Sequence, residues 1–471
     1  MDLEGLAALD ATAQAELVRT RAASPRELVE SAIARIERRN NELGAVVWPM
    51  YERALAEADG DLPDGPFRGV PILIKDLGAM VAGVPQAGGI KPLRDMRWTP
   101  PFDSELIVRL RRAGFIIVGK SNASELGIVP AAEPPAWPPT RNPFDVTRSP
   151  GGSSGGSACA VAAGMVPIAH ANDGGGSIRI PASCCGLFGL KPSRGRISFA
   201  PYLGDVNGGL VNEHVVTRSV RDSAAVLDLL AGVVGGDPYA APTPARPFRD
   251  EVGAPVAPLR IGYATRYPHV DGGLAESHPD CVAAVAHAAS ELRARGHLVE
   301  PAEIVEMHDP EWIPRFLCLW VVGVTMELDE TAAKLGRPVA EGDVEPLTWA
   351  LGELGKMIGG PAYAEAWRWI QQASRRIARF WERYDLWLTP TVTEPPVPIG
   401  YFKSPPDDPL AGIFRAAAFA PFTAVFNATG QPACSVPLYR NERNLPIGVQ
   451  LAAAYGREDL LIRVASSLLG R

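Results

Sequence analysis

The sequence lacks the features that would point to a metal, a membrane or a nucleic acid. Its 471 residues include only seven histidines, in no HExxH or HxH pattern, and six cysteines with no CxxC pair. Metal centres usually need such spacings, so we expect no metal and no other cofactor. The longest apolar runs, such as residues 316–324, are too short to span a bilayer. The net charge is −7 without any basic run, which argues against nucleic acid and membrane as partners.

Other absences bear on location and size. The first four residues are acidic and apolar, with no basic and then apolar leader, so we expect no secretory signal. The cysteines form no disulfide-like framework, which indicates reduced thiols and a cytoplasmic protein. We find no internal repeat and no low-complexity tail. A 46% apolar composition is ample for a large core, so the chain is expected to be globular.

Glycine, in contrast, is abundant and is concentrated between residues 149 and 181. Two glycine-rich turns, 151–156 and 174–176, flank the apolar segment 158–165. Consecutive glycines before Ser177 allow several N–H groups to converge on one point, as a developing negative charge requires. A linker would be polar throughout, and a Walker phosphate loop would need a Gly-Lys-Ser/Thr ending that does not occur. The pattern predicts an oxyanion hole beside a hydroxyl nucleophile.

Lys75 is a candidate for the base. It ends the apolar run 70–74, which reads as a buried strand, and buried sheets present ligand-binding residues at such ends. An isolated lysine there most often extends to water. With few histidines available, however, a desolvated and therefore neutral lysine can take the role of base. Because such a lysine need not reach the nucleophile directly, we expect Ser153 to bridge the two.

The alternation of strand and helix patterns predicts an α/β fold. We expect one large twisted sheet, mixed but mostly parallel, covered by helices on both faces. Helices are predicted over 13–39 (in two pieces, the second capped by Ser24), 52–59, 104–113, 223–230, 280–296 and 458–469. Strands are predicted over 70–74, 115–118, 259–263, 385–390, 435–438 and 447–452, and a turn over 426–433.

At the glycine-rich stretch and Lys75 the sequence resembles the amidase signature family. The serine-rich hallmark is present as Gly-Gly-Ser-Ser-Gly-Gly-Ser over residues 151–157, and Ser177 follows Ser153 by 24 residues in Gly-Gly-Gly-Ser-Ile-Arg-Ile-Pro. Lys75 precedes Ser153 by 78 residues. Three spaced motifs are far more specific than one glycine-rich loop.

The resemblance implies a catalytic apparatus and a domain plan. Ser177 would be the nucleophile, Ser153, after a cis peptide bond, the proton shuttle and Lys75 the base. The backbone N–H groups of Gly174, Gly175 and Gly176 would hold the oxyanion. The whole chain, 1–471, would be one domain, with core motifs in 69–222 and 380–471 and a variable pocket segment over about 235–420.

Further residues are expected around this site. Ser154, Asp173 and Arg179 would support it, the last two as a buried ion pair rather than as catalysts. Cys318 and Trp320 are candidates for the substrate pocket. Seven tryptophans lie between residues 311 and 387, a cluster more typical of core packing than of a ligand wall. His170 and His214 are interpreted as structural.

Three functions are compatible with these motifs. The preferred one is a stand-alone serine amidohydrolase for small, fairly hydrophobic amides, such as amide oligomers of the nylon cyclic-dimer kind, anilides or carbamates, with some esterase activity. The second is a glutaminase-type subunit of a transfer-RNA-dependent amidotransferase, whose family usually has a polar residue where this chain has Ile180. The third is a binding protein without catalysis. A small-molecule amide or carbamate is the expected partner, and the chain is expected to be a monomer or homodimer.

Overall fold

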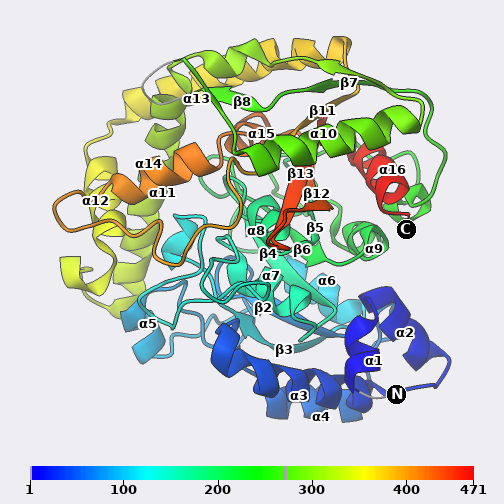
Figure 1. Cartoon of the computed structure of the whole chain (residues 1–471). Coiled ribbons are helices and arrows are strands. Elements are labelled where there is room, and N and C mark those ends of the chain that lie inside the picture. Colours follow the sequence, from blue (N-terminus) through cyan, green and yellow to red (C-terminus); the bar gives the residue numbers. More distant parts are fainter. Residues whose placement is uncertain (1–2, 269–272, 471) are drawn as a thin grey trace.

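An eleven-stranded sheet runs through the centre of the computed structural model, which describes residues 3–268 and 273–470 (Figure 1). From one edge to the other its strands are β1 (Val46–Pro49), β3 (Ile116–Ser121), β2 (Pro71–Lys75), β4 (Ile168–Asp173), β6 (Asn212–Thr217), β5 (Phe188–Lys191), β12 (Ala433–Arg440), β13 (Pro446–Ala453), β11 (Leu386–Pro390), β7 (Arg260–Tyr263) and β10 (Leu298–Pro301). A separate small sheet pairs β8 (Arg266–Pro268) with β9 (Leu274–Glu276).

Parallel pairing holds within two blocks of this sheet. One block is β3-β2-β4 and the other is β11-β7-β10. Antiparallel pairs add β1 at one edge and connect the blocks through β6, β5, β12 and β13. The predicted α/β fold with a large mixed sheet is confirmed. Because β2 and β4 are parallel neighbours, their carboxyl ends, Lys75 and Asp173, lie at the same edge of the sheet.

Helices cover both faces of the sheet, as predicted. One face carries α6 (Glu105–Arg112), α9 (Val220–Leu230), α10 (Pro279–Ala294) and α16 (Glu458–Leu469). The other carries α3 (Pro25–Leu43), α4 (Tyr51–Asp59), α7 (Gly155–Ala162), α11 (Trp312–Leu335), α12 (Pro346–Lys356), α13 (Gly360–Ala378) and α15 (Ala424–Thr429). Side chains of β2 point alternately to the two faces of the sheet. Ile72 and Ile74 pack on the face that carries α6 and α9, and Leu73 packs on the face that carries α3 and α7.

The remaining α-helices of the described residues are α1 (Leu3–Ala8), α2 (Ala11–Arg19), α5 (Lys91–Asp95), α8 (Arg179–Cys184) and α14 (Ala411–Phe419). The capping box predicted at Ser24 is present, since Ser24 accepts from the Glu27 N–H and Glu27 accepts from the Ser24 N–H. The turn predicted over 426–433 is wrong in its first half. Residues 424–429 form α15, and the chain turns only at Gly430, whose φ is 86°.

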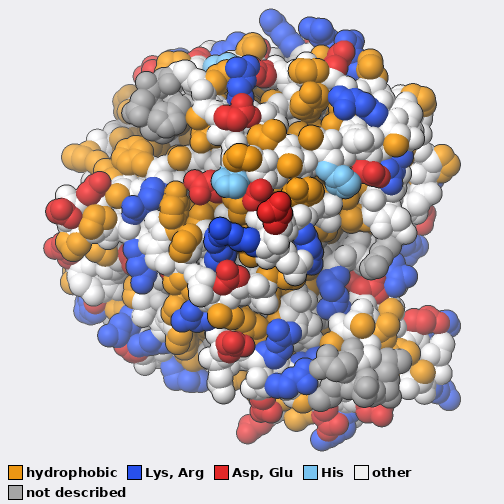
Figure 2. Space-filling model, viewed as in Figure 1, with side chains coloured by type: hydrophobic (Ala, Val, Ile, Leu, Met, Phe, Trp, Pro, Cys, Tyr) orange, Lys and Arg blue, Asp and Glu red, His pale blue; other side chains and the backbone are white. Residues whose placement is uncertain are grey.

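The surface seen in Figure 2 carries Lys and Arg interspersed with Asp and Glu rather than one large field of either sign. Among the described residues, no helix is both long and apolar enough to cross a membrane. The same part of the chain contains no group of three or more His, Cys, Asp or Glu side chains that could hold a metal ion.

Candidate active site

Lys75 lies completely buried at the carboxyl end of β2. Its Nζ is 2.7 Å from Ser153 Oγ and 2.5 Å from Asn172 Oδ1. Burial lowers the pKa of Lys75 to about 7, although the negative charges of Glu213 and Asp173 act in the opposite direction. A large share of neutral amine is therefore present at neutral pH, as a base requires.

Ser153 and Ser154 occupy the tight turn that leads into α7. The Gly152–Ser153 peptide bond is cis. A side chain at Gly152 would not fit, because a Cβ there would lie 2.1 Å from the carbonyl oxygen of Ala131. Ser154 Oγ donates to the carbonyl oxygen of Asn172 at 3.2 Å, which ties the turn to the end of β4. The turn thus holds Ser153 Oγ next to Lys75, at the end of the neighbouring strand β2.

Ser177 follows the glycine turn after β4 and faces open space. Its exposed fraction is 9%, and among the described residues its hydroxyl makes no hydrogen bond. It lines two cavities, described below, and Ser153 lines one of them as well. A hydroxyl that is accessible from two cavities and makes no hydrogen bond among the described residues is suited to attack a bound substrate.

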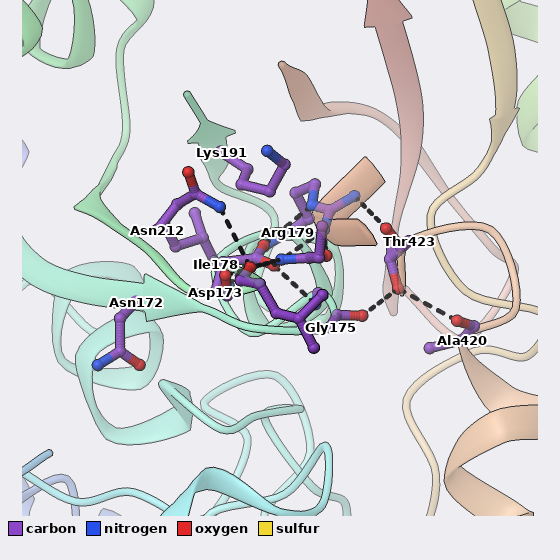
Figure 3. Close-up of polar contacts among 12 residues, drawn as sticks. Asn172, Asp173, Gly175, Ile178, Arg179, Lys191, Asn212, Ala420 and Thr423 are labelled. Carbon is purple, nitrogen blue, oxygen red and sulfur yellow. Dashed lines mark hydrogen bonds and ion pairs between the residues drawn. The ribbon is translucent and has the colours of Figure 1, made fainter. Parts of the chain in front are cut away.

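A buried ion pair between Asp173 and Arg179 holds the turn that carries Ser177 (Figure 3). The Asp173 carboxylate accepts from the backbone N–H groups of Gly176 at 2.7 Å and Ile178 at 3.2 Å. Burial alone would raise the pKa of Asp173, but the charge and hydrogen bonds of Arg179 outweigh it and lower the pKa to about 2. The carboxylate therefore stays ionised and keeps the turn in place.

Arg179 is in turn fixed from the far side of the site. It donates to the Thr423 carbonyl oxygen at 2.9 Å, to Gln450 Oε1 at 2.8 Å and to Asn427 Oδ1 at 2.6 Å. The Thr423 hydroxyl also donates to the Gly175 carbonyl oxygen at 2.6 Å (Figure 3). Because every polar group of the pair has a partner, the desolvation cost of burying it is offset.

The same contacts define the oxyanion donors. Gly176 has a φ of 138°, and a Cβ there would lie 2.6 Å from Ile180 and Thr423 side-chain atoms, so glycine is required. Its N–H points to Asp173, which removes Gly176 from the set of donors predicted from the sequence. The N–H groups of Gly174, Gly175 and Ser177 have no acceptor among the described residues.

Two cavities meet at Ser177, and Trp320 lines both. The first, here called the charged cavity, encloses about 1360 Å³ including its opening to solvent, and Ser153, Glu213, Glu327 and Lys334 contribute to its wall. The second, here called the apolar cavity, encloses about 1290 Å³ on the same measure. Its described lining contains no charged side chain and includes Gly175, Ile180, Phe316 and Ala420.

The two pocket residues predicted from the sequence lie on different sides of α11. Trp320 packs between the cavities, stacked on Phe316 with ring centroids 5.6 Å apart. Cys318 is absent from the described lining of either cavity, and its thiol points to the carbonyl oxygen of Ala362 on α13, 3.9 Å away. Two residues along a helix span about 200°, so both side chains cannot face one cavity.

Comparison with known proteins places this geometry in a family. The Amidase family model matches residues 27–462. The chain belongs to the amidase family. It is 41% identical over 471 residues to a 6-aminohexanoate-cyclic-dimer hydrolase of Paenarthrobacter ureafaciens, covering 98% of this chain and 94% of that protein.

Solved structures agree with this assignment. A structure of 6-aminohexanoate cyclic dimer hydrolase superposes with a TM-score of 0.94 at 39% identity and covers 100% of this chain and 97% of that one. A bacterial aryl acylamidase of the amidase signature family superposes with a TM-score of 0.85 at 25% identity, covering 98% and 95%. The chain is therefore a non-peptide C–N hydrolase by family.

Several site residues of this amidase escaped the sequence analysis. Asn172 contacts Lys75 Nζ, and its register partner across β4 and β6 is Glu213. Glu213 forms a hydrogen bond with His170 Nε2, while His170 Nδ1 accepts from the Lys75 backbone N–H at 3.3 Å. Only Asn172 had a usable signal, since it directly precedes Asp173 in the motif. Glu213 is brought in by strand pairing, which no local pattern reveals.

Proposed function

We propose that this amidase is a serine amidohydrolase that cleaves small, fairly hydrophobic amides through an acyl-enzyme. Ser177 is the nucleophile, Ser153 the proton shuttle and Lys75 the base. The observation that carries the proposal is the 2.7 Å contact between Lys75 Nζ and Ser153 Oγ beside the uncommitted Ser177 hydroxyl. The lowered pKa of Lys75 supports its role as a base at neutral pH.

The proposed acylation moves one proton along a chain of three groups. As Ser177 Oγ forms its bond to the carbonyl carbon, its proton passes to Ser153 Oγ, whose own proton passes to neutral Lys75 Nζ. The N–H groups of Gly174, Gly175 and Ser177 stabilise the oxyanion. As the C–N bond breaks, the proton returns through Ser153 to the leaving nitrogen.

Deacylation follows the same path in reverse. Water enters where the amine has left, loses a proton through Ser153 to Lys75 and attacks the ester carbonyl. The C–O bond to Ser177 then breaks, and the proton returns to Ser177 Oγ. The products are a carboxylic acid and an amine, and the three catalytic groups regain their starting states.

For the substrate class we propose amides with an apolar part on each side of the scissile bond. Amide oligomers are favoured by the likeness to 6-aminohexanoate-cyclic-dimer hydrolases, and anilides by the likeness to the aryl acylamidase. Carbamates and esters are further candidates, because the same acyl transfer would open them. The apolar cavity supports a hydrophobic substrate.

The glutaminase alternative is not favoured. A glutamine substrate carries an α-carboxylate that needs a cationic partner, and Lys334 is the sole cation among the described lining residues of both cavities. Lys334 already lies 3.5 Å from the carboxylate of Glu330. Ile180, which replaces the polar residue typical of that subunit, lines the apolar cavity.

Substitution of the nucleophile tests the proposal. We expect Ser177→Ala to lower kcat by about 10⁴-fold or more on a panel of amides, anilides, carbamates and esters read by product mass. Unchanged thermal unfolding would show that the fold is kept. Retained turnover, or glutaminase activity exceeding that on every panel member, would contradict the proposal. Location in the cytoplasm and assembly as a monomer or homodimer stay predictions.

A further inference from the structure

The charged cavity is lined by three carboxylates, and two of them are already satisfied. Glu213 is bonded to His170 Nε2, and Glu330 pairs with Lys334, whose ammonium also lies 4.7 Å from the ring centre of Trp98. The Glu330 contact engages Lys334, the one cation among the described lining residues of this cavity. These contacts leave Glu327 as the carboxylate whose partner has to be sought elsewhere.

Glu327 faces the cavity without a partner. It lies on the face of α11 that lines the cavity, where Trp320, Val324, Thr331 and Lys334 recur three or four residues apart. Among the described residues, its carboxylate makes no hydrogen bond or ion pair. Burial raises the pKa of Glu327, although the charge of Lys334 opposes this. A desolvated carboxyl group with no partner is costly, and a bound N–H donor would remove the cost.

The position of Ser153 tells which part of the substrate enters this cavity. Ser153 lines the charged cavity and is not among the described lining of the apolar cavity. In the proposed mechanism Ser153 returns a proton to the leaving nitrogen, so the amine part of the substrate lies in the charged cavity, which Ser153 lines. The acyl part then occupies the apolar cavity.

We propose that Glu327 determines specificity by accepting a hydrogen bond from a second nitrogen on the amine part of the substrate. The substrates are then amides with an apolar acyl part and an amine part that carries an ammonium or a second amide N–H. This inference rests on the proposed roles of Ser153 and Ser177. It assigns to Glu327 the recognition of the substrate and not a step of the chemistry.

Four matched amides test the proposal with the full-length protein. Hexanoic acid is joined to hexylamine, which has no second donor, to mono-N-acetyl-hexamethylenediamine, which has an amide N–H, and to hexamethylenediamine, which has an ammonium. The fourth amide joins N-acetyl-6-aminohexanoic acid to hexylamine and so places the donor on the acyl part. We expect kcat/KM to be about tenfold higher for the donors on the amine part, with no gain for the fourth amide.

Two variants of α11 separate recognition from packing. Glu327→Met should remove the tenfold preference, so that the kcat/KM values for the amides with a donor on the amine part approach that for the hexylamine amide. Asp329→Asn removes a charge from an exposed position on the same helix and should leave the preference intact. Glu327→Gln distinguishes the two donors, because it should lower the rate for the ammonium substrate more than for the acetamide.

The outcomes also separate this inference from the proposed function. Equal losses on all four amides in Glu327→Met, or no loss on any, would overturn the role of Glu327. A preference for the donor on the acyl part would overturn the assigned orientation. A wild-type protein that cleaves none of the four would overturn the proposed function itself.

Discussion

The two cavities that meet at Ser177 are bounded by the same helix but by different halves of it. The first half of α11 contributes Trp312, Phe316 and Trp320 to the apolar cavity, and the second half contributes Glu327 and Lys334 to the charged one. A change of composition within one helix thus gives the two sides of the scissile bond opposite surroundings. This difference can sort the two parts of an asymmetric substrate.

The buried charged groups next to Ser153 and Ser177 are arranged differently. Asp173, Arg179 and Lys75 lie at strand and helix ends, are fully buried, and have all their charges paired or hydrogen-bonded. On α11, by contrast, Lys334 pairs with Glu330 and lies over the ring of Trp98, while Glu327 makes no ion pair among the described residues. The comparison teaches that changes to Lys75, Asp173 or Arg179 should alter kcat, whereas changes on α11 should alter the choice of substrate.

Within this comparison the largest effect is expected from Lys75, the base of the proposed mechanism. Only its neutral form can accept a proton, so kcat/KM should rise with pH through about 7 and level off above it. Lys75→Met should lower kcat by about 10²–10⁴-fold and abolish this rise. Steady-state kinetics between about pH 5 and pH 9 provide the measurement.

A control for this variant is its unfolding. Removing a buried lysine whose charged form is disfavoured should leave the fold stable, as urea denaturation would show. If Lys75→Met kept the pH dependence of the wild type, another group would accept the proton. The contrast between the buried groups that determine kcat and the α11 residues that determine substrate choice would then lose its main support.

A smaller effect is expected from Asp173→Asn. The change leaves Arg179 buried without its counter-charge and weakens the hold on the Gly176 and Ile178 N–H groups. We expect the free energy of unfolding to fall by about 3–5 kcal/mol, measured by urea denaturation. In the folded fraction kcat should fall by about 10²-fold with little change in KM, because the oxyanion donors lose their position. An unchanged kcat in a folded variant would show that the turn holds without the ion pair.

The motif side of the site could be predicted from the sequence because its information is local. Lys75 ends an apolar strand, and the glycine turns at 151–156 and 174–176 identify Ser153 and Ser177. The expected helices and strands follow from capping and periodicity for the same reason. The helical start at residue 424 could not be read, because Asn427, Thr429 and Gly430 are typical turn residues. The helix is fixed by contacts with distant parts of the chain, such as the buried hydrogen bond from Asn427 to Asp173.

The pocket side could be predicted only in part because it depends on which helix face meets which loop. Cys318 and Trp320 are close in sequence, yet one faces α13 and the other the cavities. Most tryptophans of the 311–387 segment pack against other core residues, and of the seven only Trp312 and Trp320 are among the described cavity-lining residues. The interpretation of the tryptophan cluster as core packing thus fits five of the seven tryptophans and does not account for Trp312 and Trp320, which line the cavities.

The smallest effect is expected on the first half of α11, where Phe316 and Cys318 form a matched pair. Phe316 lines the apolar cavity and stacks on Trp320, so Phe316→Ala should lower kcat/KM for amides with a hexanoyl or larger acyl part by about tenfold, mainly through KM. Acetamides of the same amines, which leave this cavity mostly empty, should change by less than about twofold. Cys318→Ala, a smaller truncation on the side of the helix that faces α13, should change neither set. Equal losses in both variants would mean that α11 acts through its packing on α13, and the apolar cavity would no longer be the acyl site.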